Sequence, residues 1–218
     1  MTRFFRFTPF VLAGLLAAYQ PVLAQNDPRA EAILDAVSKK YAATPAYRAN
    51  FTFTVENGAS DSKDNYTGDL VVKGSKYRLK AGGQEIINNG TTIWTIIHDA
   101  KEVNVSTYEP EADDINPSQI FRIYENGYKY LFLEETRDKG VAYEVIDLIP
   151  EKRDQQVFKV RLTIVRADKS IRNLRMFEKN GSRTRYTVNR FAPDPTVDDK
   201  TFVFDKSQYK NYEVIDLR

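Results

Sequence analysis

The residue types that carry most enzyme chemistry are scarce in this sequence. It has one histidine, His98, and no cysteine. His98 follows an apolar stretch and precedes Asp99, and no second histidine stands at metal-ligand spacing. We interpret His98 as a turn residue at the end of a strand. The lack of cysteine excludes disulfides, thiolate metal sites and cysteine nucleophiles.

Carboxylate pairs are the other groups that could do chemistry. Asp113–Asp114, Glu134–Glu135 and Asp198–Asp199 have the residue types used in glycoside hydrolysis or calcium binding. They stand in polar stretches or at strand ends, where such residues usually face solvent. The sequence also lacks the G-x-S-x-G, H-E-x-x-H, P-loop and G-x-G-x-x-G motifs. We therefore expect a protein that is not an enzyme, with no catalytic residue, metal ion or cofactor.

The first 24 residues have the features of a secretory signal peptide. Two arginines precede a short apolar core at Phe10–Ala18, and small residues favour cleavage after Ala24. The apolar run is shorter than the ~20 residues that a membrane-spanning helix needs. We expect residues 1–24 to be removed, and residues 25–218 to form a single domain in the periplasm.

Removal of this signal also removes the excess of positive charge. The sequence has 32 basic and 30 acidic residues, and the signal contains Arg3 and Arg6 but no acid, so 32 − 2 leaves 30 of each. A neutral domain lacks the electrostatic field of a nucleic-acid-binding protein. We expect no nucleic-acid partner.

The expected domain begins with helical periodicity and continues with strands. Asn26 or Asp27 can cap a helix that begins near Pro28 and ends before Pro45. After Tyr47 the apolar period changes to two, as in strands with one solvated face. Asn-Gly at 89–90 predicts a hairpin between residues 84–88 and 92–97, and two terminal strands are expected at Thr201–Phe204 and Glu213–Leu217.

A second, short helix is expected in the middle of the chain. Asn116-Pro117 is a helix-start signal, and Asn126-Gly127 ends the segment. The predicted fold class is α+β. A curled antiparallel sheet of about 10–11 strands forms an open half-barrel, and the N-terminal helix and the mid-chain lid helix cover it.

Several short motifs then occur in a characteristic order. They are A-x-x-I-L at Ala30–Leu34, R-A-N-F-T-F at Arg48–Phe53, G-D-L-V-V-K at Gly68–Lys73, K-Y-R-L at Lys76–Leu79, N-G-T-T-I-W at Asn89–Trp94, Asn116-Pro117, I-D-L-I-P at Ile146–Pro150 and T-F-V-F at Thr201–Phe204. With these motifs the chain from the Ala30 region to Arg218 resembles the LolA-like outer-membrane lipoprotein carriers. One position departs from the family pattern. Enterobacterial carriers have a lid-holding arginine directly after the V-K of the G-D-L-x-V-K strand, whereas Gly74 follows Lys73 here and Arg78 is offset.

The resemblance implies a periplasmic lipoprotein chaperone. Such a carrier takes acylated lipoproteins from an inner-membrane lipoprotein-releasing ABC transporter, shields their acyl chains and delivers them to the outer membrane, where a receptor is a further candidate partner. The 13 phenylalanines and 13 tyrosines agree with an apolar cavity in a monomeric carrier. The expected cavity residues of the sheet are Phe51, Phe53, Leu70, Val72, Leu79, Trp94 and Ile96, and those of the lid are Ile120, Phe121 and Tyr124.

Two other functions fit the same sequence features. One is an envelope-stress sensor of the same fold that acts through protein contacts. The other is a general lipid or glycolipid carrier, which has the same cavity but other cargo.

Overall fold

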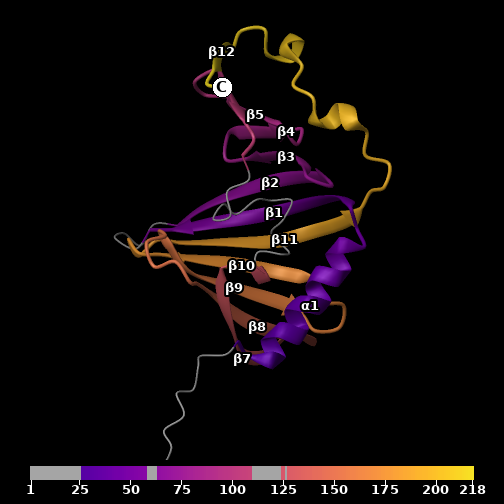
Figure 1. Cartoon of the computed structure of the whole chain (residues 1–218), viewed down its shortest axis with the longest axis vertical. Helices are drawn as coiled ribbons and strands as arrows, with labels where there is room; N and C mark the ends of the chain where they lie inside the picture. Colours follow the sequence, from indigo (N-terminus) through magenta and orange to yellow (C-terminus); the bar gives the residue numbers. More distant parts are fainter. Residues whose placement is uncertain (1–25, 58–62, 110–123, 126) are drawn as a thin grey trace, which may run out of the picture.

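The computed structural model describes residues 26–57, 63–109, 124–125 and 127–218 (Figure 1). Within these residues the α-helix α1 comprises Pro28–Ala42, and the 3₁₀ helices η2 and η3 comprise Asp199–Phe202 and Lys206–Tyr209. The strands are β1 (Ala46–Glu56), β2 (Lys63–Lys73), β3 (Lys76–Ala81), β4 (Gln84–Asn88), β5 (Thr92–Ile97), β6 (Glu102–Thr107), β7 (Tyr128–Asp138), β8 (Val141–Pro150), β9 (Val157–Val165), β10 (Ile171–Glu178), β11 (Arg183–Pro193) and β12 (Glu213–Asp216).

All of these strands belong to one sheet, in the order β12-β6-β5-β4-β3-β2-β1-β11-β10-β9-β8-β7. Neighbouring strands are antiparallel, apart from the parallel pair of β12 and β6. The sheet is open and curled (Figure 1). The prediction of a curled, open antiparallel sheet is therefore confirmed. The sheet has 12 strands, slightly more than the roughly 10–11 that the sequence predicted.

The N-terminal helix forms where the capping signals predict it. The Asp27 side chain accepts hydrogen bonds from the backbone N–H groups of Arg29 at 2.8 Å and Ala30 at 3.3 Å, and Pro28 occupies the first turn. The helix lies across the half of the sheet that contains β7–β10 (Figure 1), and we call the side of the sheet that carries α1 the front face. Its buried stripe comprises Ala30, Ile33, Leu34, Val37 and Tyr41.

We call the other side of the sheet the back face. A C-terminal segment, residues 194–212, covers the half of the back face that contains β1–β6. Phe202 is fully buried against Ala46 and Val197, and Tyr209 is buried with Ile87 and Val103. The expected strand at Thr201–Phe204 is wrong. Residues 199–202 form η2 instead, because the Asp198 side chain accepts a hydrogen bond from the N–H of Lys200 at 2.9 Å and starts a helical turn.

Two expected elements lie outside the described residues. One is the signal peptide, residues 1–24. The other is the mid-chain helix, of which the structure describes only Tyr124 and Glu125.

Candidate functional site

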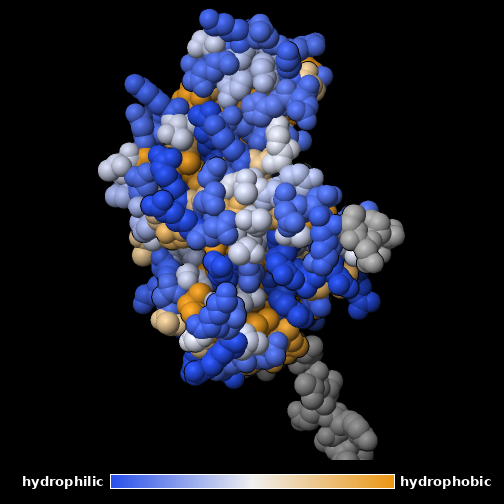
Figure 2. All heavy atoms as spheres, turned by 180° about the vertical axis from the view of Figure 1, so that it is seen from behind, coloured by the Kyte–Doolittle hydropathy of each residue, from blue (hydrophilic) through white to orange (hydrophobic). Residues whose placement is uncertain are grey.

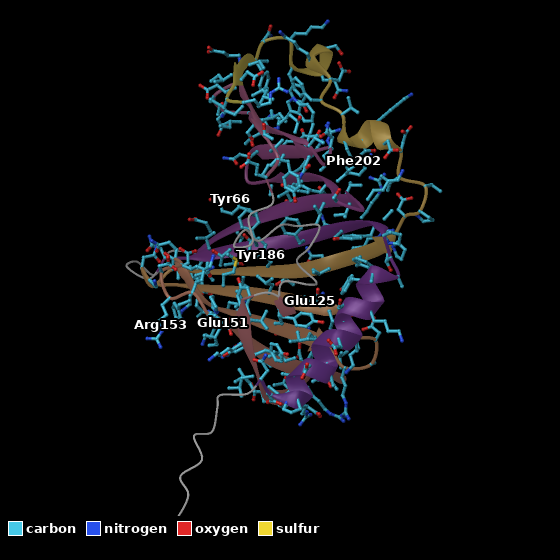
Figure 3. All side chains as sticks on the ribbon, in the orientation of Figure 1. Tyr66, Glu125, Glu151, Arg153, Tyr186 and Phe202 are labelled. Carbon is cyan, nitrogen blue, oxygen red and sulfur yellow. The ribbon has the colours of Figure 1, made fainter. Side chains whose placement is uncertain are left out.

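Four aromatic rings form a cluster on the front face of the three central strands. Phe51 and Phe53 come from β1, Tyr66 from β2 and Tyr186 from β11. Phe53 lies directly opposite Tyr66 on one side and Tyr186 on the other. The ring centroids of Phe53 and Tyr66 are 4.9 Å apart, and those of Phe53 and Tyr186 are 5.7 Å apart. We call these four residues the front aromatic cluster (Figure 3 labels Tyr66 and Tyr186).

Glycines next to the cluster make room for its rings. A Cβ atom at Gly68 would lie 2.3 Å from Cζ of Phe51, so the Phe51 ring occupies the space where a side chain of β2 would stand. A Cβ atom at Gly82 would lie 3.4 Å from Cζ of Phe53. Both rings therefore lean from β1 over β2 and toward the β3–β4 turn.

Aliphatic side chains extend this apolar surface beyond the rings. Leu70 is paired with Leu79, and Leu79 with Ile86, so these three side chains share the front face of β2, β3 and β4. Val72 lies on the same face but is buried, in a cluster with Tyr47 and Tyr77. Five of the expected sheet residues thus share one face, namely Phe51, Phe53, Leu70, Val72 and Leu79.

Much of this surface is not closed off by the described residues. Phe51, Phe53, Leu70 and Leu79 are only half-buried, and Tyr66 is 42% exposed. Burial raises the pKa of Tyr186, and the nearby Glu178 raises it further, so that phenol stays neutral. The front aromatic cluster is therefore uncharged, apolar and partly open.

The structure corrects the expectation for Trp94 and Ile96. Both side chains point to the back face, where Trp94 stacks on Phe204 with centroids 6.0 Å apart and Ile96 is fully buried. They form a core with the C-terminal segment. The sequence could not distinguish the two faces of β5, because both are apolar. Ile93 and Ile97 point to the front face, where Trp94 and Ile96 were expected.

Of the three expected lid residues, the structure describes only Tyr124. It is buried against α1, and its hydroxyl donates a hydrogen bond to Oδ1 of Asp35 at 2.9 Å. Burial and this hydrogen bond raise the pKa of Tyr124 to about 12. Ile120 and Phe121 lie outside the described residues.

Two members of the front aromatic cluster, Tyr66 and Tyr186, were missed by the sequence prediction. Tyr66 alternates with Gly68 and Leu70 along β2, so the period-two rule that selected Leu70 could also have found it. Tyr186 has no comparable signal. Its place follows from the pairing of β11 with β1, which are far apart in the sequence.

The described residues that were considered for catalysis or metal binding contact other side chains of the protein. Nδ1 of His98 lies 3.0 Å from the hydroxyl oxygen of Tyr212, in an exposed turn after β5. Glu135 pairs with Arg29 and Arg166, while Asp199 pairs with Lys73 and Lys76. Within the described part of the chain, no three histidine, cysteine or acidic side chains are grouped to hold a metal ion. Asp113 and Asp114 lie outside it.

Comparison with known proteins identifies the family. Residues 42–205 match the family model of the outer membrane lipoprotein carrier protein LolA. The chain belongs to the LolA family. The resemblance inferred from the short motifs is therefore confirmed. No match was found among curated proteins.

Solved structures of low sequence identity superimpose on this chain. An uncharacterized conserved protein from Thermus thermophilus superimposes with a TM-score of 0.58 at 13% identity, covering 86% of this chain and 99% of that one. A LolA superfamily protein from Nitrosomonas europaea gives a TM-score of 0.44 at 13% identity, covering 81% and 98%. LprF from Mycobacterium bovis gives 0.48 at 13% identity, covering 79% and 97%. In the described ranges, no helix of this chain has the length and apolarity to cross a bilayer.

Proposed function

We propose that this LolA-family protein is a periplasmic carrier that binds the acyl chains of lipoproteins on the front face of its sheet. The observation that supports this proposal is the front aromatic cluster, whose rings and aliphatic neighbours form a half-exposed apolar surface. Soluble proteins rarely leave a continuous apolar surface uncovered unless it binds something. The family membership supports the same cargo class.

The energetics of acyl transfer explain why such a surface is needed. Each methylene group moved out of a membrane into water costs about 0.8 kcal/mol, so a chain of about 16 carbons costs on the order of 12 kcal/mol. An aromatic and aliphatic surface replaces most of that apolar environment. It offers no fixed hydrogen-bonding pattern, so the cargo is held by packing and can be released to the next protein.

Handover requires partners at both membranes. We propose that an inner-membrane lipoprotein-releasing ABC transporter supplies the cargo, and that an outer-membrane receptor or the outer membrane itself accepts it. The protein then acts as a chaperone without catalysing a reaction. A sensor of envelope stress is the second candidate, since it would use the same fold to bind a protein.

Two adjacent residues of β2 give a matched test of acyl binding. Tyr66 points to the front face, and Thr67 points to the back face, where it pairs with Thr52. Both are exposed, so glutamate is tolerated by the fold at either position. We expect Tyr66→Glu to weaken binding of a fluorescent fatty acid at least tenfold and Thr67→Glu to leave it unchanged. Equal affinities of the two variants would exclude the front face as the acyl site.

Cargo identity is tested on protein purified from its own host. Native mass spectrometry should detect co-purified triacylated peptides or lipoproteins. A protein that carries no such cargo and also fails to bind the fluorescent fatty acid would argue against the carrier and in favour of the sensor.

A further inference from the structure

The back face of β9, β10 and β11 carries an unusual row of like charges. Arg161 on β9 lies directly opposite Arg175 on β10, which lies directly opposite Arg185 on β11. Strands are about 4.8 Å apart, so the three side chains are crowded into roughly 10 Å. Like charges directly opposite each other destabilise a sheet. The row therefore costs stability unless opposite charges offset it.

A second row of side chains crosses the same three strands on the same face, two residues away from the arginine row. Lys159 is paired with Phe177, and Phe177 with Arg183. The Phe177 ring has four cations within 6 Å of its centroid, from Lys159 at 4.3 Å to Arg183 at 5.9 Å. We call these four cations and Arg185 the basic lattice; its members are Lys159, Arg161, Arg175, Arg183 and Arg185.

Carboxylates offset only part of this charge. Asp147 pairs with Arg161 through two hydrogen bonds of 2.7 and 2.9 Å and with Lys159 at 3.6 Å. Glu56 pairs with Arg175 at 2.7 Å and also faces Lys63. At longer range Glu56 attracts Arg185, and Glu134 attracts Arg161.

Two arginines of the basic lattice, both on β11, are open to solvent. Arg183 and Arg185 are exposed. Glu56 lies directly opposite Arg183 across β1 and β11, but its carboxylate forms ion pairs with Arg175 and Lys63. The exposed guanidinium groups of Arg183 and Arg185 are therefore accessible to an external anion on this face.

Apolar side chains continue the basic lattice toward the β7 edge. The ring centroids of Phe158 and Phe177 are 6.3 Å apart, and Phe158 also lines a hollow of about 410 Å³ with Ile149, Lys129 and Arg153. Phe158 is 46% exposed and Ile149 42% exposed. Figure 2 shows the molecule from behind, with a largely hydrophilic face and hydrophobic side chains exposed at its lower end, where β7 and β8 lie.

We propose that this part of the back face docks on the surface of an anionic phospholipid bilayer. The basic lattice matches the phosphate charges of the lipid headgroups. The neighbouring Phe158 and Ile149 match the boundary between headgroups and acyl chains, where apolar side chains flanked by cations are stabilised. A soluble phosphate or an acidic peptide would use the cations alone. The exposed apolar residues therefore favour a lipid surface.

The test is flotation of the full protein with vesicles of equal parts phosphatidylglycerol and phosphatidylcholine. We expect binding to these vesicles, loss of binding at high salt, and little binding to pure phosphatidylcholine. Each basic residue near an anionic bilayer contributes about 1 kcal/mol, so the double variant Arg183→Gln/Arg185→Gln should bind about 30-fold more weakly. The matched control is Lys206→Gln/Lys210→Gln, which removes the same charge from the exposed C-terminal segment and should bind normally.

Two further variants distinguish a lipid surface from an acidic peptide and from the acyl site. Phe158→Ser should weaken vesicle binding, whereas Tyr66→Glu, on the front face, should not alter it, so failure of the acyl site and failure of the docking surface are distinguishable. The proposal is wrong if both double variants bind equally. It is also wrong if a polyglutamate peptide binds as tightly as the vesicles and Phe158→Ser has no effect, because the partner would then be an acidic protein segment.

Discussion

The ring of Phe51 lies on Gly68, its direct partner across β1 and β2. Gly68 is not among the residues with positive φ, so its backbone conformation is open to other amino acids. Gly68 is therefore required for the space that it leaves to the Phe51 ring.

Gly68→Ala tests this relationship. The added Cβ would lie 2.3 Å from Cζ of Phe51, so the ring must move away from β2. We expect a loss of about 1–3 kcal/mol of stability, typical of overpacking, and weaker fatty-acid binding because the front aromatic cluster is displaced. Urea denaturation and a fluorescent fatty acid measure the two effects. Adding Phe51→Leu to the alanine variant should recover stability, and additive losses in that double variant would contradict the contact.

Glu85 connects the sheet to the C-terminal segment from a buried position. Its carboxylate accepts hydrogen bonds from Nε of Arg78 and, at 2.9 Å, from the hydroxyl of Tyr209. Nη1 of Arg78 also donates to the carbonyl of Thr201 at 3.2 Å. Glu85 thus orients two groups that hold residues 194–212 against β3–β6.

Removing this carboxylate should release the segment. Glu85→Ala leaves the Arg78 charge half-buried and unpaired, so we expect a loss of about 3–5 kcal/mol of stability. Tyr209→Phe removes one hydrogen bond to a charged group and should cost about 2 kcal/mol. Denaturation gives the magnitudes, and amide exchange locates the opening. Equal losses for both variants would contradict the central role of Glu85.

The sequence predicted local elements well because their signals are local. Asp27 and Pro28 specify the start of α1, and Asn89 with Gly90 specifies the β4–β5 hairpin, whose strands have the predicted bounds. Both signals act over a few residues. The order of motifs along the chain also identified the family.

The sequence could not predict features that depend on distant pairing. In β5 both faces are apolar, and the contact of Trp94 with the distant Phe204 shows that Trp94 points to the back face. The alternating T-F-V-F pattern indicated a strand, yet Phe202 is buried in a 3₁₀ turn. Tyr186 joins the front aromatic cluster through the pairing of β1 and β11, which no local pattern reveals.

Tyr124→Phe tests the attachment of Tyr124 to α1. The variant loses the hydrogen bond to Asp35, so we expect a cost of about 1–2 kcal/mol near neutral pH. The folded protein also holds the phenol proton up to a pKa of about 12, above the usual value of 10. This stabilisation is complete below pH 10 and is lost as the pH rises toward 12.

The alkaline half of an unfolding-free-energy profile measures this effect. The wild type should lose its advantage over Tyr124→Phe across that pH window. Tyr41, whose pKa burial also raises to about 12, should keep part of the alkaline dependence in the variant. A constant difference between the two proteins up to pH 12 would show that Tyr124 is not held in its neutral form.

Lys40 and Asp168 join the end of α1 to the turn between β9 and β10. Nζ of Lys40 donates to Oδ2 and to the backbone carbonyl of Asp168, both at 2.8 Å. The N–H and hydroxyl of Ser170 donate to Oδ1 at 3.1 and 2.6 Å. Burial acts to raise the pKa of Asp168, but the bonds from Lys40 and Ser170 outweigh it and lower the pKa to about 2.

Asp168→Asn should therefore change how stability depends on acid. Because the folded pKa is depressed, the ionised carboxylate stabilises the fold above the unfolded pKa of about 3.9, and this contribution is lost as the pH falls through about 2. The side chain is 55% exposed, so we expect at most about 1 kcal/mol at pH 7. Urea denaturation between pH 7 and 2 should show the difference between wild type and Asp168→Asn shrinking toward the acid end. Asp154→Asn is the control, since it removes the same charge from an exposed turn and should change stability little at pH 7. A difference at position 168 that does not shrink as the pH falls would instead place the effect in the packing of the turn.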